Sequence, residues 1–165
     1  MDIKTVKFIG YSGSGKTMLV EKIVKILSGE GLKVATVKHD VHGLDIDKEG
    51  KDSYRYSKAG ANMSIVSSPE MTVYKVHRTL SLNDIISDIK GIDIIIIEGY
   101  SSDGEYPTIC VARKETGKGI KGDIQKLSAV ASDYSSDELL NLGYDGKQFD
   151  LNDARGIANY IKSLN

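Results

Sequence analysis

The chain has 165 residues, a length that suits one compact domain with its own core. Hydrophobic residues make up 40% and charged residues 27%, as in ordinary globular proteins, and the net charge of −1 excludes a whole-chain electrostatic footprint for nucleic acid or an anionic membrane. The single cysteine, Cys110, excludes an internal disulfide, and the longest apolar run, Ile92–Ile97, carries Asp93 and is too short to span a bilayer. We therefore expect a single domain over residues 1–165 in the cytoplasm, without a signal peptide.

Strands and helices alternate along most of the chain. The periodicity of apolar residues and the turn residues between them define the elements. In chain order, these patterns predict a strand at 4–9, a helix at 16–27, a strand at 33–38, a loop at 39–50, a short helix at 51–58, strands at 62–67 and 71–77, a helix at 82–89, strands at 92–97, 108–112 and 127–131, and helices at 135–142 and 153–164.

The order of these elements predicts an α/β fold. A mostly parallel sheet flanked by helices accounts for the alternation. The run 92–97 is typical of a strand covered on both faces, because it is almost unbroken in apolar residues. The strands at 62–67 and 71–77 flank Ser-Pro-Glu and predict an antiparallel hairpin at one edge of the sheet.

A glycine-rich segment separates the first strand from the first helix. It reads Gly10-Tyr11-Ser12-Gly13-Ser14-Gly15-Lys16-Thr17 and fits G-x-x-x-x-G-K-[ST] without gaps. In this setting the backbone N–H groups converge on phosphate and the helix start adds partial positive charge. We predict that residues from Gly10 to Met18 bind a nucleoside triphosphate, that Lys16 supplies charge to the outer phosphates, and that Thr17 ligates Mg²⁺.

Two acids follow predicted strands at the edge where ligands bind in such sheets. Glu98 follows the strand at 92–97 and can bind Mg²⁺ through water or orient an attacking water, whereas the alternative is a solvated acid. Asp40 follows the strand at 33–38 and is a predicted Mg²⁺ ligand. The same loop also carries His39, His42, Asp45 and Asp47, which leaves a transition-metal site as a weaker alternative because the spacing matches no strong metal motif.

Several charged residues further along the chain are candidates for ligand contacts. Lys51 and Arg55 lie four residues apart and on one helix would share a face that binds an anion, unless that face is simply solvated. The segment 113–122 holds four cations and is either a mobile loop that closes on phosphate or an exposed turn. Asp133 follows the strand at 127–131 and can accept hydrogen bonds from N1 and N2 of guanine, although no complete N-K-x-D motif is present.

Longer motifs resemble one known family. Lys38-His39-Asp40-Val41-His42, the stretch 50–61 that reads G-K-D-S-x-R-x-x-x-A-G-A, and Glu98-Gly99-Tyr100 are similar, together with the P-loop, to the MobB family, and the likeness extends from Val6 to about Asp133. It implies a P-loop α/β fold, GTP binding with weak hydrolysis, a homodimer, and partnership with the MobA nucleotidyltransferase that joins GMP to molybdopterin. Ser101 departs from the family, whose members often have lysine there.

Three functions remain open. The first, which the resemblance implies, is a GTP-binding adaptor of molybdenum cofactor maturation with slow turnover at most. The second is a P-loop kinase or ligase acting on a small molecule, although the segment 113–122 holds one arginine where such kinases usually carry an arginine-rich lid. The third is a regulator that uses nucleotide as a dimerisation switch.

Overall fold

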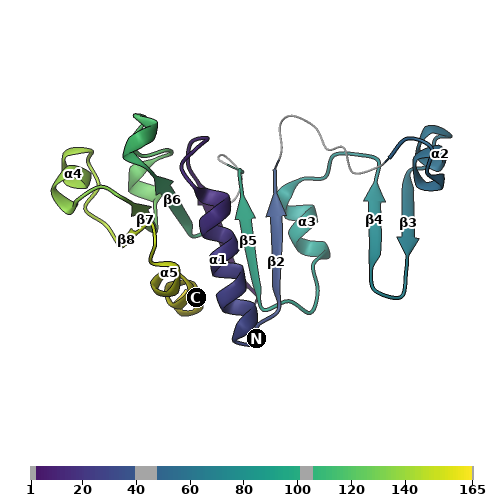
Figure 1. The fold of residues 1–165 in the computed structure, drawn as a ribbon, viewed down its shortest axis with the longest axis horizontal. Coiled ribbons are helices and arrows are strands. Elements are labelled where there is room, and N and C mark those ends of the chain that lie inside the picture. The colour runs from purple at the N-terminus through teal and green to yellow at the C-terminus, as the bar shows by residue number, and fades with distance from the viewer. Residues whose placement is uncertain (1–2, 40–47, 101–105, 165) are drawn as a thin grey trace. The chain divides into compact units, whose positions relative to one another are not determined.

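The computed structural model describes residues 3–39, 48–100 and 106–164 (Figure 1). The chain separates into two compact units, one formed by Met1–His39 with Ile89–Asn165 and the other by Asp40–Asp88. Each unit is described by itself below.

The first unit is built on a six-stranded sheet in the order β2-β5-β1-β6-β7-β8 (Figure 1). Every neighbouring pair in it is parallel. Its strands are β1 (Lys4–Ile9), β2 (Val34–Lys38), β5 (Ile94–Glu98), β6 (Thr108–Ala112), β7 (Ala129–Ser132) and β8 (Gln148–Asp150). The chain leaves β1 toward β2 on one side and later reaches β6 on the other, so the glycine-rich segment after β1 lies at a topological switch point, where such sheets bind ligands.

Both faces of this sheet are covered. Val6 and Phe8 of β1 are fully buried in a cluster with apolar residues of α1 (Lys16–Gly29) and α5 (Ala154–Ser163). Ile9 belongs to a second cluster, which includes Leu139 of α4 (Ser136–Asn141) and partly buried residues of the segment after β6. All four isoleucines of β5 are buried, which confirms the prediction, drawn from the apolar run, of a strand covered on both faces.

Side chains fix the starts of the two C-terminal helices. Ser135 and Glu138 form a reciprocal capping box at α4. At α5 the Asp153 side chain accepts a hydrogen bond from the Gly156 N–H at 2.8 Å and so caps the start of the helix.

The second unit holds two short helices and a hairpin. Its elements are α2 (Asp52–Lys58), β3 (Met63–Ser67), β4 (Thr72–Val76) and α3 (Leu82–Asp88). The predicted antiparallel hairpin is confirmed, with Ile65 opposite Tyr74, and its strands form a two-stranded sheet of their own rather than an extension of the main sheet. His77 lies within hydrogen-bonding distance of Ser57 and Ser64, at 3.0 and 3.3 Å, and so links the hairpin to α2.

The predicted elements correspond to observed ones within two residues at most ends, and the α/β fold with a mostly parallel sheet is confirmed. The short strand β8 was not predicted, because three residues carry too little pattern to separate a strand from a loop. Within the described residues, no helix combines the length and apolar character needed to cross a membrane.

Candidate functional site

The glycine-rich segment connects β1 to α1 at the carboxyl edge of the sheet. Gly15 immediately precedes α1 and has φ 87° and ψ 12°. Among the described residues no side chain caps the start of α1, so the N–H groups of its first turn remain available to a ligand. The helix dipole adds partial positive charge at the same point, which makes this turn suited to an anion.

Two glycines in the loop are required by its shape. A Cβ on Gly10 would lie 2.3 Å from the carbonyl oxygen of Val111 and 2.8 Å from the Ser14 hydroxyl oxygen, so no larger residue fits between the loop and β6. Gly13 has φ 82°, a conformation that glycine adopts without steric cost, and a Cβ there would meet no atom within 4 Å. The loop is therefore tight against β6 at Gly10 and open at Gly13.

Lys16 lies across this loop. Its Nζ donates hydrogen bonds to the carbonyl oxygens of Gly10 and Tyr11, at 2.9 and 3.0 Å. Burial lowers the pKa of the Lys16 ammonium, the Glu98 carboxylate opposes that shift, and Lys121 and Lys38 add to it as like charges. A bound phosphate would supply the negative charge that favours the protonated lysine.

Thr17 contacts Glu98, one of the two acids that the sequence predicts at this edge of the sheet. The Thr17 hydroxyl donates to Glu98 Oε1 at 2.9 Å, and Glu98 is the last residue of β5, opposite Phe8 of β1. The backbone of Glu98 is held as well, because its carbonyl oxygen accepts a hydrogen bond from the His39 N–H at 2.9 Å. A hydroxyl and a carboxylate this close are oxygen ligands of the kind that Mg²⁺ takes beside nucleotide phosphates.

Ser14 has a polar group that finds no partner among the described residues. It is 1% exposed, and its buried hydroxyl oxygen makes no hydrogen bond there. A buried hydroxyl without a partner is costly. Its place inside the loop, between Gly13 and Gly15, suits a hydrogen bond to a phosphate oxygen. Ser12 and Met18 are exposed on the same loop and first turn, Met18 by 63%, and so are accessible to a ligand.

The basic segment after β6 lies against the same loop. The ammonium groups of Lys118 and Lys121 are each 5.6 Å from the centre of the Tyr11 ring. A Cβ on Gly15 would lie 3.2 Å from an Nη atom of Arg113. Thus the segment contacts the phosphate loop at both ends of the glycine-rich stretch. The sequence indicated a basic loop here but did not indicate which cations contact the P-loop, because that depends on β6 pairing with β1.

Asp133 lies next to this segment, directly after β7. Its Oδ1 accepts a hydrogen bond from the Lys114 N–H at 2.8 Å. One carboxylate oxygen therefore fixes the backbone just beyond β6. The predicted contact of Asp133 with guanine stays a prediction.

The predicted Mg²⁺ ligand Asp40 lies outside the described residues, as do His42, Asp45 and Asp47. His39, at the start of that loop, packs on Tyr100 with ring centres 4.8 Å apart. In the part of the chain that the structure describes, no group of three or more His, Cys, Asp or Glu side chains is arranged to hold a metal ion.

Lys51 and Arg55 belong to the second unit. Lys51 is extended, with φ −77° and ψ 152°, and α2 begins after it, so the expected shared helix face of Lys51 and Arg55 is not formed. Gly50, with φ 88°, turns the chain there, and Asp52 takes the first helical position, where a carboxylate is favourable. Arg55 is 3.7 Å from the Asp52 carboxylate, in an exposed ion pair. The predicted role of Lys51 and Arg55 in binding an anion stays a prediction.

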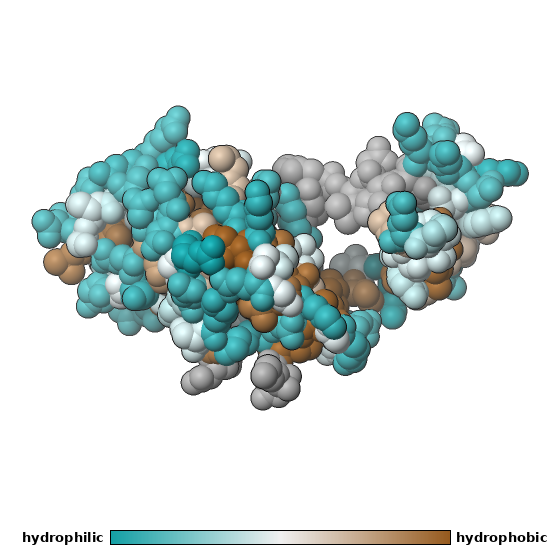
Figure 2. Space-filling view, turned by 60° about the horizontal axis from the view of Figure 1, so that its bottom comes forward, coloured by the Kyte–Doolittle hydropathy of each residue, from teal (hydrophilic) through white to brown (hydrophobic). Residues whose placement is uncertain are grey.

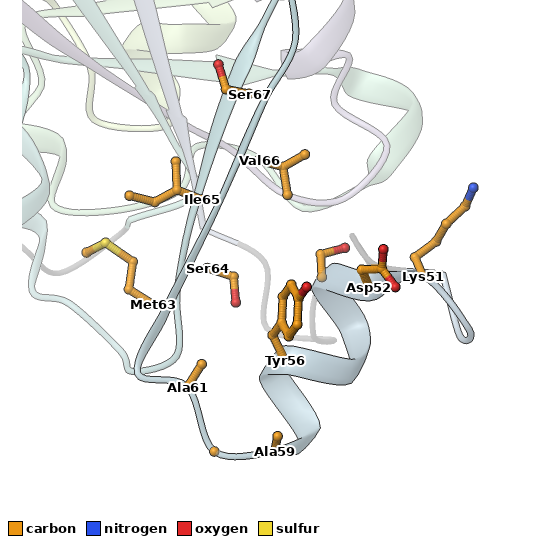
Figure 3. A pocket seen from close by; sticks show the side chains of 12 residues that line it. Lys51, Asp52, Tyr56, Ala59, Ala61, Met63, Ser64, Ile65, Val66 and Ser67 are labelled. Atoms are coloured by element: carbon orange, nitrogen blue, oxygen red, sulfur yellow. The ribbon is translucent and has the colours of Figure 1, made fainter.

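The second unit also contains a pocket of about 910 Å³ between α2 and β3 (Figure 3). Figure 3 shows Tyr56 on the helix facing Ser64 on the strand. The G-K-D-S and A-G-A stretches of the long motif contribute much of its lining, which comprises Lys51, Asp52, Ser53, Tyr56, Ala59, Gly60, Ala61, Met63, Ser64, Ile65, Val66 and Ser67.

Comparisons with known proteins agree on one family. The sequence profile of MobB, described as molybdopterin guanine dinucleotide synthesis protein B, matches residues 5–133. The molybdopterin-guanine dinucleotide biosynthesis adapter protein of Escherichia coli K12 is 33% identical over 165 residues, covering 96% of this chain and 91% of that protein. The adapter protein of Haemophilus influenzae is 32% identical over 158 residues, covering 93% and 85%.

Solved structures give the same result for the fold. The crystal structure of Bacillus subtilis MobB superposes with a TM-score of 0.76 at 25% identity and covers 99% of both chains. A further structure, of molybdopterin-guanine biosynthesis protein B, gives a TM-score of 0.69 at 25% identity over 98% of this chain and 99% of the other.

Proposed function

This chain belongs to the MobB family of molybdopterin guanine dinucleotide biosynthesis adapter proteins, and we propose that it binds GTP with Mg²⁺ and assists a MobA-type nucleotidyltransferase that joins GMP to molybdopterin. The observation that carries the nucleotide part of the proposal is the convergence of Lys16, Thr17 and Glu98 at the start of α1. These side chains are the ones that phosphate and its metal ion require in P-loop proteins.

The residues present fit a nucleoside triphosphate and Mg²⁺. The Ser14 hydroxyl is buried without a partner in the described residues, and the first turn of α1 is uncapped by side chains. Phosphate oxygens would accept from these groups and from Lys16, while Thr17 and Glu98 would hold the metal ion directly or through water. When bound, Mg²⁺ neutralises part of the charge on the outer phosphates.

Weak GTP hydrolysis is a second part of the proposal. Glu98 is partly buried at the end of β5 and can accept a hydrogen bond from a water near the phosphate loop. The same carboxylate already accepts a hydrogen bond from the Thr17 hydroxyl at 2.9 Å. One group could therefore both help to hold the metal ion and orient the attacking water. An adaptor that holds nucleotide for a partner needs binding more than turnover, and slow hydrolysis is consistent with that task.

The proposal includes a homodimer formed through the hairpin of the second unit. Large apolar side chains are exposed there, including Met63 at 50%, Ile65 at 55% and Tyr74 at 67%. Figure 2 shows small hydrophobic areas among pale and hydrophilic surface on this unit. Because Ile65 and Tyr74 are directly opposed across the hairpin, they lie on one face of the two-stranded sheet. A two-stranded sheet with an exposed apolar face gains stability by packing against a second copy.

We also propose that the protein prefers guanine nucleotides and that its partners are the transferase and molybdopterin. Membership of the family supports these parts of the proposal, and Asp133 is the candidate residue for recognising guanine. We further propose that the protein acts in the cytoplasm, where nucleotides are available. The test is calorimetric titration of the protein with GTP, ATP and molybdopterin, with and without the transferase. We expect GTP to bind more tightly than ATP and the transferase to form a complex; equal affinity for ATP and GTP would count against the adaptor function and favour a small-molecule kinase.

A further inference from the structure

Arg113 occupies a special position beside the phosphate loop. It follows β6, the neighbour of β1 on the side opposite β5, so the loop after β1 has Glu98 on one flank and Arg113 on the other. The guanidinium lies against Gly15, where an added Cβ would be 3.2 Å from Nη2 and 3.7 Å from Cζ. Gly15 is also the last residue before α1, whose N-terminal turn is suited to an anion.

The backbone that carries Arg113 is anchored. The carbonyl of Arg113 accepts from the Thr116 hydroxyl at 2.8 Å and from the Thr116 N–H at 3.1 Å, which closes the short turn Lys114–Thr116. The Lys114 N–H donates to Asp133 at 2.8 Å, and the Lys114 ammonium pairs with Glu138 at 2.6 Å. These contacts tie the residues after Arg113 to β7 and α4. The side chain therefore starts from a fixed point, as a preorganised binding group requires.

Arg113 keeps unused hydrogen-bonding capacity. Its Nε is buried and has no partner among the described residues. The carboxylate recorded near it belongs to Glu115, which is 85% exposed and lies 4.0 Å from Nη1, beyond hydrogen-bond distance. A buried donor without an acceptor costs free energy, and more when the donor carries charge. The other such side-chain atom in the described residues is the Ser14 hydroxyl oxygen, in the glycine-rich loop after β1.

The charges around the loop favour binding of an anion. Lys16 is flanked by Lys121 and Lys38, whose like charges lower its pKa further after the main effect of burial, and Glu98 is the carboxylate that opposes them. Lys118 and Lys121 lie over the Tyr11 ring. Such a set of cations around one uncapped helix start is repulsive unless a polyanion binds among them.

We propose that Arg113 is a second phosphate-binding cation of this site, which contacts the phosphate chain held by the loop from the β6 side while Lys16 contacts it from within. The planar guanidinium is suited to bidentate contact with phosphate oxygens, which would also supply the acceptor that Nε lacks. The inference rests on the proposed nucleotide binding, but it concerns the phosphate groups and not the base.

The test is isothermal titration of the full-length protein with GTP and with inorganic pyrophosphate, in the presence of Mg²⁺. Arg113→Gln removes the charge and keeps most of the side-chain length, Arg113→Lys keeps a point charge, and Lys126→Gln removes one charge from an exposed position on the turn before β7. We expect Arg113→Gln to weaken both ligands about ten-fold or more, Arg113→Lys to recover part of that loss, and Lys126→Gln to bind as the parent does.

The outcomes separate this inference from the proposed function. Parent-like affinity of Arg113→Gln for both ligands, with Lys16→Ala strongly impaired, would overturn the role of Arg113 and leave the nucleotide site intact. Tight pyrophosphate binding without GTP binding in the parent would refute the proposed function, and the pyrophosphate titrations would still decide on Arg113. If both Arg113 variants lose affinity equally and the free proteins unfold at lower temperature, Arg113 packs the loop and the inference is wrong.

Discussion

The hydroxyl of Thr17 donates to the carboxylate of Glu98 at 2.9 Å across 81 residues of sequence. Thr17 lies in the first turn of α1, and Glu98 ends β5. Because β5 pairs with β1 in parallel, with Phe8 opposite Glu98, the strand delivers the acid to the edge where the phosphate loop begins. One hydrogen bond thus joins the two halves of the candidate metal site.

Glu98→Gln is expected to slow GTP hydrolysis about ten-fold or more while GTP still binds. The amide keeps an oxygen that accepts a hydrogen bond from the Thr17 hydroxyl. It loses the negative charge that would help to bind Mg²⁺ and attract a proton of the attacking water. Phosphate release measures turnover, and titration measures binding. Glu21→Gln makes the same chemical change on the exposed surface of α1 and should behave as the parent. A parent-like rate in Glu98→Gln would remove Glu98 from the chemistry.

Lys16→Ala is expected to lower affinity for GTP ten-fold or more, or about 1.4 kcal/mol at least, because a charge-assisted contact to phosphate is lost. In the structure the Lys16 ammonium is held by two loop carbonyls, at 2.9 and 3.0 Å, and is already close to where phosphate would bind. Lys22→Ala, at an exposed position of the same helix, is the matched control. Unchanged affinity in the Lys16 variant would exclude the loop as the phosphate site.

The sequence predicted Lys16, Thr17 and Glu98 as site residues but did not predict the position of Arg113 beside them. The G-x-x-x-x-G-K-T pattern and the acid after an apolar strand carry their positions in short, local signals, and the structure brings Lys16, Thr17 and Glu98 together. Arg113 gave no such signal, because its contact with Gly15 depends on the order of strands in the sheet. The helix α2 starts one residue later than predicted, because the backbone of Lys51 is extended and Lys51 is the residue before the helix.

A charged substitution on the hairpin tests the proposed dimer. Ile65→Asp places a carboxylate on the exposed apolar face beside Tyr74, and desolvating that charge in an interface is costly. We expect the mass measured by light scattering at a fixed concentration to fall toward that of a monomer. Leu140→Asp makes the same change at a 61% exposed leucine of α4 and should leave the mass unaltered. A parent protein that is monomeric at high concentration would refute the dimer.

The pair of Glu138 and Lys114 predicts a weak acid sensitivity. The hydrogen bond from Lys114 and those from the Ser135 backbone and side chain lower the pKa of Glu138 from 4.5 to about 2. Because the pKa is lower in the folded protein, this stabilisation is complete above pH 4.5 and is lost as pH falls from there toward 2. The free energy of unfolding of Glu138→Gln should thus fall less between pH 6 and pH 3.5 than that of the parent.

Glu70→Gln, in the exposed turn of the hairpin, is the control for this comparison and should follow the parent. The effect should be small, since both partners are about half exposed and water screens the pair. Identical pH dependence of the parent and Glu138→Gln would show that the pair does not contribute.

The last prediction concerns the choice of base. A carboxylate at residue 133 would accept from N1–H and N2–H of guanine, whereas adenine would present the N1 lone pair to it and leave the acid unpaired. One oxygen of Asp133 is already bound to the Lys114 N–H at 2.8 Å, so Asp133→Ala would also disturb the segment after β6. Asp133→Asn is the sharper change, because its amide oxygen can keep that bond while the negative charge is removed.

We therefore expect Asp133→Asn to reduce the ratio of GTP to ATP affinity, measured by competition with Mg²⁺ present, about ten-fold or more, and to leave pyrophosphate binding nearly unchanged. The two readouts are independent, since pyrophosphate reports on the loop and Lys16 without any base. A ratio that survives in Asp133→Asn would assign guanine recognition to another residue and keep Asp133 as an anchor for Lys114. A fall in pyrophosphate affinity of the same size would show that the segment carrying Arg113 had moved, and that the base was not being read at this position.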